Sequence, residues 1–235
     1  MAELVATPIV ALDVPTAAQA LQLVRALGAT CGFYKVGGEL FTAEGPSLVR
    51  CIRELGHQVF LDLKFHDIPS TVRGSVRSAV GHGASMVTVH ASGGMEMLRA
   101  AVDGAGATCL VMGVTVLTSL DAASLSEAWG KGGVQVDGEV LRLAGLCAAA
   151  GAHGIVCSGH EVAGIRAAFP RLAPLVPGIR FEAGATHDQA RVVTPRAAVA
   201  AGARYLVLGR AVTAAPDPRA AMERALEDLA LRVEG

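Results

Sequence analysis

Charged residues stand at the ends of three consecutive apolar runs near the start of the chain. Asp13 closes the first run and Lys35 the second. The third run ends in Asp62 and Lys64, and Asp67 follows three residues later, before a proline. An ammonium group held beside carboxylates can supply a positive charge and a proton to a reacting group. A structural ion-pair network is the alternative, but apolar residues would stabilise such a buried place better. We therefore interpret these five residues as a catalytic array.

The elements that must position this array are short β-rich runs separated by helical patterns. The runs are Thr7 to Leu12, Gly32 to Val36, Gln58 to Leu63, Ser85 to His90, Cys109 to Val116, Gly154 to Cys157, Leu172 to Val176 and Tyr205 to Leu208. Most lack polar alternation, which is typical of parallel strands covered on both faces. A closed barrel is favoured over an open doubly wound sheet, although strand count alone does not exclude the sheet. We predict an α/β fold, a single parallel eight-stranded (β/α)8 TIM barrel, with residues 1–235 as one catalytic domain.

The ends of two helices can be recognised in the sequence. Thr16 is a predicted N-cap, and Gly28 is predicted to end the same helix. Asp217 is predicted to cap the last helix, with Pro218 in its first turn. The glycine-rich segment Gly130 to Gly138 is predicted to be a loop.

The barrel prediction assigns places to the charged residues. Asp62 and Lys64 are two residues apart, so they point to the same side of their strand, the barrel mouth where chemistry occurs. Phosphate often binds to the loops after strands seven and eight. Here these loops contain Pro177-Gly178-Ile179-Arg180 and Gly209-Arg210. Glycine permits close approach of the backbone and arginine offers two parallel donors, so the sequence predicts a phosphate site there.

Composition and charge exclude several classes of protein. A formal net charge of -1 lacks the basic excess of general nucleic-acid or membrane-surface binders. No apolar run approaches the roughly 20 residues of a membrane span, and the first residues do not resemble a signal peptide. The five cysteines form no C-x-x-C pair, which indicates reduced core thiols. We predict a cytoplasmic protein without nucleic-acid or membrane partners.

Other motifs are weak. Gly104-x-Gly106 follows a helical pattern, and Cys109 stands where a dinucleotide-binding turn needs its third glycine. The histidines show none of the common metal-site spacings. His90 ends the fourth run and could line the site, although a hydrogen-bonded structural role is the stronger prediction. The direction of His66 stays open.

The segment Asp62-Leu63-Lys64-Phe65-His66-Asp67-Ile68-Pro69-Ser70-Thr71 resembles the D-x-K-x-x-D-I-P-x-T signature of the orotidine 5'-phosphate decarboxylase family, especially its bacterial branch. Further matching segments follow in family order over nearly the whole chain. They are Leu12-Asp13-Val14-Pro15, Tyr34-Lys35-Val36-Gly37, Val114-Thr115-Val116-Leu117-Thr118-Ser119, Pro177-Gly178-Ile179-Arg180, Gln189 and Gly209-Arg210. The resemblance implies decarboxylation of orotidine 5'-monophosphate to uridine 5'-monophosphate and CO2 in pyrimidine biosynthesis. It also implies a homodimer that needs no metal or organic cofactor.

The resemblance implies catalytic roles for the signature residues. Lys64 would protonate C6 of a carbanion-like intermediate, and Asp62 would lie beside the departing carboxylate. Asp67, Ile68 and Thr71 would reach into the site of the partner subunit. Each homodimer would then hold two composite sites.

The resemblance also implies substrate contacts. Lys35 and Asp13 would hold the ribose hydroxyls. Thr118 would contact the pyrimidine edge, with Ser119 as the alternative. The phosphate ligands would be Arg180, Gln189, Gly209 and Arg210.

Two other functions compete with this interpretation. A Mg2+-dependent sugar-phosphate decarboxylase or aldolase of the same barrel superfamily shares the D-x-K-x-x-D core, but Ile68-Pro69-x-Thr71 and Gln189 favour orotidylate. A non-catalytic nucleotide-binding barrel would need no proton donor, so Lys64 between two aspartates counts against it.

Overall fold

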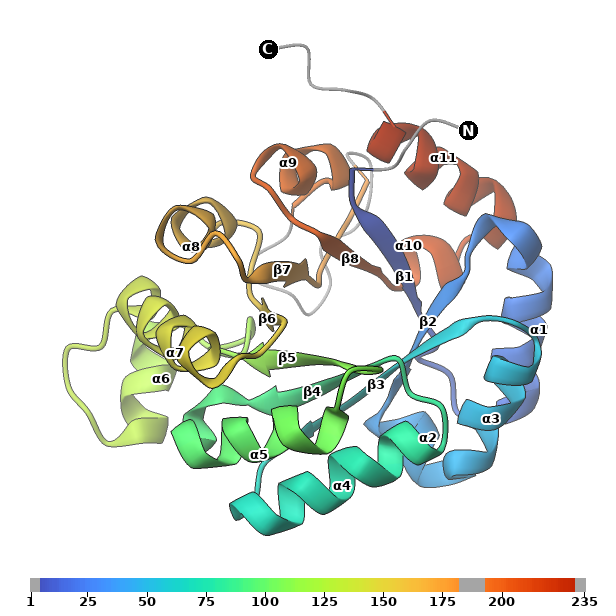
Figure 1. Ribbon diagram of the computed structural model, residues 1–235. Coiled ribbons are helices and arrows are strands. Elements are labelled where there is room, and N and C mark those ends of the chain that lie inside the picture. Colours follow the sequence, from blue (N-terminus) through green and yellow to red (C-terminus); the bar gives the residue numbers. More distant parts are fainter. Residues whose placement is uncertain (1–4, 182–192, 231–235) are drawn as a thin grey trace.

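Eight parallel strands form a closed barrel in chain order in the computed structural model, which describes residues 5–181 and 193–230 (Figure 1). The strands are β1 (Thr7–Ala11), β2 (Phe33–Gly37), β3 (Gln58–Phe65), β4 (Met86–His90), β5 (Leu110–Val114), β6 (Gly154–Val156), β7 (Ala173–Val176) and β8 (Tyr205–Leu208). Because β1 pairs with both β2 and β8, the sheet has no free edge. The predicted fold class is confirmed, and each predicted run contains one of these strands or differs from it by at most two residues at either end.

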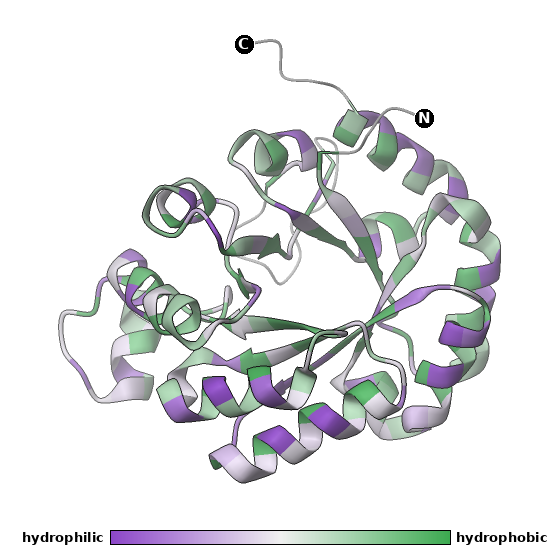
Figure 2. Cartoon of the chain, in the orientation of Figure 1, coloured by the Kyte–Doolittle hydropathy of each residue, from purple (hydrophilic) through white to green (hydrophobic). Residues whose placement is uncertain are grey.

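Helices surround the barrel. They are α1 (Ala17–Leu27), α2 (Gly38–Glu44), α3 (Pro46–Glu54), α4 (Pro69–Gly81), α5 (Met95–Ala105), α6 (Ala122–Trp129), α7 (Val136–Ala150), α8 (Val162–Ala168), α9 (Pro195–Ala200), α10 (Arg210–Thr213) and α11 (Pro218–Ala230), with the short 3-10 turns η1 (Gly28–Thr30) and η2 (Ala91–Gly93). Figure 1 shows α4 and α5 packed side by side. Hydrophilic residues lie on the outward faces of the helices, and hydrophobic residues dominate the strands (Figure 2). This pattern places the apolar layer between strands and helices.

The predicted helix ends are confirmed. The Thr16 side chain accepts a hydrogen bond from the Gln19 main-chain N–H, and Gly28 ends α1 with φ 52°. Asp217 Oδ1 accepts the Ala220 main-chain N–H at 3.0 Å. These local contacts set where the helices begin and end.

The predicted loop over residues 130–138 is wrong in its last three residues, because α7 already begins at Val136. The first turn of α7 contains Asp137 and Glu139, and carboxylates are stabilised near a helix N-terminus. Glu139 also accepts hydrogen bonds from Lys131 at 2.7 Å and Arg142 at 2.6 Å, which lower its pKa. The Lys131 contact joins the loop before α7 to the first turn of the helix. Glycine content alone therefore does not predict where this helix begins.

Apolar side chains fill the barrel below its mouth. This inner cluster consists of Ile9, Ala11, Phe33, Phe60, Met86, Met112, Leu175 and Val207. A larger apolar cluster lies between the strands and the helices. The barrel is therefore a packed core that can hold polar side chains rigidly at its open end.

The cysteines are free thiols, and all but Cys51 are buried. Burial raises the pKa of Cys109 and of Cys147 to about 12, which keeps both thiols in the unreactive protonated form. Within residues 5–181 and 193–230, we find no helix with the length and apolar character that crossing a membrane requires.

Candidate active site

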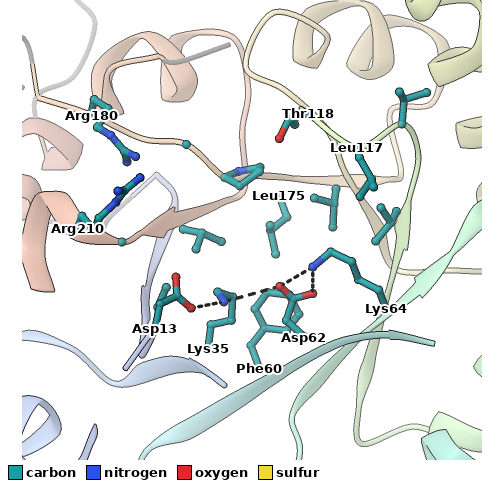
Figure 3. A pocket seen from close by; sticks show the side chains of 18 residues that line it. Asp13, Lys35, Phe60, Asp62, Lys64, Leu117, Thr118, Leu175, Arg180 and Arg210 are labelled. Atoms are coloured by element: carbon teal, nitrogen blue, oxygen red, sulfur yellow. Dashed lines mark hydrogen bonds and ion pairs between the residues drawn. The ribbon is translucent and has the colours of Figure 1, made fainter. Parts of the chain in front are cut away.

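A cavity of about 270 Å³ opens at the carboxyl ends of the strands. It is lined by Ala11, Asp13, Lys35, Phe60, Asp62, Lys64, Val114, Val116, Leu117, Thr118, Val156, Leu175, Pro177, Gly178, Arg180, Val207, Gly209 and Arg210. Charged residues occupy two parts of this cavity and apolar residues lie between them (Figure 3). This is the end of a TIM barrel at which ligands bind and reactions occur.

Four charged side chains, one from the segment after β1 and the others from β2 and β3, form a continuous ion-pair chain. Lys35 Nζ lies 2.9 Å from Asp13 Oδ1 and 3.8 Å from Asp62 Oδ2. Lys64 Nζ lies 2.9 Å from Asp62 Oδ1 and 3.1 Å from Asp62 Oδ2. The side chains of Lys35 and Asp62 are only 12% and 13% exposed, whereas Lys64 is 39% exposed. Lys64 is thus an ammonium group that is fixed by a carboxylate and still open to a ligand.

The backbone of β3 is irregular where it carries this array. Its pairing with β4 runs from Leu61 opposite Val87 to Phe65 opposite Val89, so a bulge separates these pairs. Lys64 has φ 48°, a left-handed conformation that costs an L-residue roughly 1–2 kcal/mol. Such local strain persists only where surrounding contacts hold it.

Two arginines line the other charged part of the cavity. Arg180 follows β7 and Arg210 begins α10 directly after β8. Figure 3 shows both guanidinium groups at the end of the cavity away from Lys64. The Arg180 main-chain N–H donates to the Val193 carbonyl at 3.1 Å, which fixes its backbone. Two guanidinium groups in one place can bind a dianion such as a phosphate.

The segment that follows β5 forms another part of the cavity wall. Leu117 and Thr118 both line the cavity, whereas Ser119 is not among its lining residues. The Thr118 hydroxyl points into the cavity in Figure 3. Thr118 can therefore hydrogen-bond to a ligand held between the ion-pair chain and the arginines.

Asp67, Ile68 and Thr71 do not line this cavity. Asp67 is exposed, and its Oδ1 accepts the Ile68 main-chain N–H at 2.6 Å. Within the described part of the chain no ion pair joins Asp67 to Lys64. Ile68 is 64% exposed, and its extended backbone before Pro69 agrees with the restriction that proline imposes. The side chains of Asp67, Ile68 and Thr71 are thus exposed and lie outside the cavity.

Gln189, the remaining residue of the predicted phosphate site, lies outside the described residues.

The histidines near the site form a pair beside the array. The ring centroids of His66 and His90 are 5.3 Å apart. Burial, followed by the neighbouring His66 and Lys64, lowers the pKa of His90 below its ordinary value. His90 is therefore neutral at neutral pH and adds no positive charge beside Lys64. Over the described ranges, no group of three or more His, Cys, Asp or Glu side chains could hold a metal ion.

Sequence reasoning missed Thr88. Its side chain is fully buried and its hydroxyl contacts both Lys64 and Asp62. In the sequence, Thr88 is a hydroxyl-bearing residue inside an apolar run. Threonine is common in strands, so its presence there does not indicate a role in the site.

The comparisons with known proteins agree with one another. The family model described as "Orotidine 5'-phosphate decarboxylase / HUMPS family" matches residues 7–225. An orotidine 5'-phosphate decarboxylase of Anaeromyxobacter sp. (strain K) is 56% identical over 212 residues, 90% of this chain and 92% of the relative. The enzyme of the same name from Nitratidesulfovibrio vulgaris (strain DP4) is 49% identical over 244 aligned residues, covering 98% of both chains.

Solved structures similar to this chain also include orotidine 5'-phosphate decarboxylases. The crystal structure of orotidine 5'-phosphate decarboxylase from Lactobacillus acidophilus has a TM-score of 0.85 at 32% identity, covering 95% of this chain and 99% of that chain. The orotidine 5'-monophosphate decarboxylase from Methanocaldococcus jannaschii, complexed with the inhibitor BMP, has a TM-score of 0.79 at 20% identity, covering 97% and 99%. At that identity the second likeness supports the barrel fold alone.

Proposed function

The chain belongs to the orotidine 5'-phosphate decarboxylase / HUMPS family, and from this premise we propose that it converts orotidine 5'-monophosphate to uridine 5'-monophosphate and CO2 in pyrimidine biosynthesis. It is a carboxy-lyase, as are its relatives by name. The observation that carries the proposal is the ion-pair chain that ends in Lys64, in one cavity with Arg180 and Arg210. We further propose that residues 1–235 form one catalytic domain and that the protein acts in the cytoplasm.

Lys64 is the proton donor in this proposal. When the bond from C6 to the carboxylate breaks, its electron pair stays on C6 in the plane of the pyrimidine ring. The π-system cannot delocalise this charge, so stabilisation must be electrostatic. The Lys64 ammonium supplies positive charge to C6 and then transfers a proton from Nζ to it, which gives uridylate. No metal or organic cofactor takes part in these steps.

Asp62 holds Lys64 and faces the substrate carboxylate. Two like charges about 4 Å apart repel by roughly 4 kcal/mol at an effective dielectric constant near 20. The departure of CO2 relieves this repulsion. Enzymes commonly lower barriers by about 8–23 kcal/mol, so the larger share falls to stabilisation of the carbanion.

The other cavity residues hold the substrate. Lys35 and Asp13 bind the ribose hydroxyls, and their 2.9 Å contact keeps them in one orientation. Thr118 binds the pyrimidine edge, and its position on the cavity wall favours it over Ser119. The phosphate ligands are Arg180, Gly209 and Arg210 of the cavity, together with Gln189, whose assignment comes from the family signature. Binding energy from the phosphate, far from C6, can then organise the charged array for reaction.

Asp67, Ile68 and Thr71 complete the site of a partner subunit in this proposal. The exposure of all three residues, with Ile68 64% exposed, supports a homodimer with shared sites. Apolar Ile68 beside a charge suits a two-fold interface at which each subunit presents the same patch.

The reaction is tested by an orotidylate assay on purified, metal-stripped protein. We expect loss of orotidylate absorbance with EDTA present. Magnesium-dependent turnover of a ketose phosphate, without turnover of orotidylate, would support the sugar-phosphate enzyme instead. Thermal stabilisation by uridylate without turnover of either substrate would support a nucleotide-binding barrel.

Arg210→Ala is expected to distinguish substrates by their phosphate. A hydrogen bond to a charged group contributes about 1.5–3 kcal/mol, so kcat/KM for orotidylate should fall roughly tenfold to a hundredfold. The phosphate-free nucleoside orotidine should be affected much less. Arg219→Ala is the control, because Arg219 lies on α11 and pairs with Glu223. Equal losses for both substrates would remove Arg210 from the phosphate site.

A further inference from the structure

Thr88 is the single residue of β4 that lies opposite the bulge in β3. The register pairs Leu61 with Val87 and then Phe65 with Val89, so residues 62–64 of β3 face one residue of β4. A register without the bulge would set Lys64 opposite His90, further along the barrel axis. The bulge instead keeps Lys64 near the level of Asp62, where the two side chains meet at 2.9 Å.

The Thr88 hydroxyl makes two hydrogen bonds whose directions are fixed. The Lys64 main-chain N–H can only donate, and it donates to Thr88 Oγ1 at 2.9 Å. The hydroxyl proton therefore points to Asp62 Oδ1, at 2.8 Å. One buried side chain thus joins the backbone of Lys64 to the carboxylate that holds its ammonium group. It replaces the strand-to-strand hydrogen bonding that the bulge interrupts.

We propose that Thr88 is a positioning residue that locks the β3 bulge and so sets the Lys64–Asp62 geometry required for proton transfer. The inference rests on the proposed decarboxylation. Without the hydroxyl, the Lys64 N–H loses its partner, the strained φ of Lys64 loses its support, and Asp62 loses one of its donors. Thr88 does not line the cavity, so its effect on reaction must pass through these two residues.

The test compares Thr88→Val with Thr88→Ser. Valine keeps the volume and removes the hydroxyl, whereas serine keeps the hydroxyl and removes a methyl group. We expect kcat for orotidylate to fall about tenfold or more in Thr88→Val, with a smaller change in KM, because a charge-assisted hydrogen bond is lost at the reacting end. Serine should restore kcat to within about threefold of wild type. The opposite order, with valine more active than serine, would assign Thr88 to packing and overturn the proposal.

Tyr34→Phe is the matched control. It also removes a buried hydroxyl, which donates to the Cys31 carbonyl at 3.0 Å outside the site. Its kcat should stay at the wild-type value even if its melting temperature falls. If Thr88→Val does not fold, Thr88→Cys replaces it. Cysteine has the shape of serine but only a weak donor and acceptor, so it should lose kcat where serine keeps it.

A crystal structure of the valine or cysteine variant gives a result that does not depend on turnover. We expect a changed Lys64 backbone and a longer distance from Lys64 Nζ to Asp62. An unchanged bulge with the wild-type contact would overturn the inference. Absence of orotidylate turnover in the wild-type protein would instead count against the proposed function.

Discussion

Replacing Lys64 with alanine is expected to lower kcat for orotidylate at least about 10²-fold, because loss of one preorganised electrostatic group usually has an effect of that size. The variant should remain folded. Lys64 is 39% exposed, and Asp62 keeps its contacts with Thr88 and Lys35. The measurements are steady-state decarboxylation, far-ultraviolet circular dichroism and binding of uridylate.

Lys131→Ala is the control for this prediction. Lys131 lies outside the cavity and pairs with Glu139 at 2.7 Å. Its removal should leave kcat unchanged, since no contact between described residues links it to the ion-pair chain. A loss of less than about tenfold in Lys64→Ala would show that another group donates the proton.

Mixing two inactive variants, Lys64→Ala and Asp67→Ala, is expected to restore activity if the subunits share their sites. In a mixed dimer, the subunit that carries Asp67→Ala keeps its own Lys64 and receives Asp67 from its partner. That site is complete, and the other site lacks both groups. Random pairing of equal amounts makes about half of the dimers mixed, each with one of two sites intact, so activity should reach roughly a quarter of wild type.

The matched control is a mixture of Lys64→Ala with Asp62→Ala. Asp62 and Lys64 contact each other within one chain, so every mixed dimer would contain two defective sites. This mixture should remain inactive under the same exchange conditions. If the Asp67→Ala mixture also stays inactive although subunit exchange is demonstrated, Asp67 belongs to its own subunit's site and the shared-site proposal fails.

Much of the fold was accessible from the sequence because it depends on local rules. Strands buried on both faces must be apolar throughout, and this requirement made the runs visible. Thr16, Gly28 and Asp217 act on backbone groups within a few residues of themselves, so their capping roles could be predicted one helix at a time. The start of α7 was missed because the glycine at position 138 suggested a loop, although the first-turn carboxylates and the i,i+3 pair of Glu139 with Arg142 are local features of a helix.

The sequence also determined which residue types gather at the barrel mouth. The carboxyl ends of all strands meet at one end of a closed parallel barrel, so residues distant in sequence converge there. Asp13, Lys35, Lys64 and Arg210 all line one cavity for this reason. Their convergence needs only the correct strand assignment and the closure of the sheet.

Only the tertiary structure decided how these residues meet. The β3 bulge, the left-handed Lys64 and its link to Thr88 depend on the register between two strands more than 20 residues apart in sequence. Strands buried on both faces are apolar almost throughout, so their sequences do not alternate and do not mark the register or the bulge. The choice between Thr118 and Ser119 also required the tertiary structure, in which only Thr118 of the two lines the cavity. The sequence by itself therefore placed Asp13, Lys35, Asp62 and Lys64 at the barrel mouth, and the pairing of β3 with β4 decided how Asp62 and Lys64 meet.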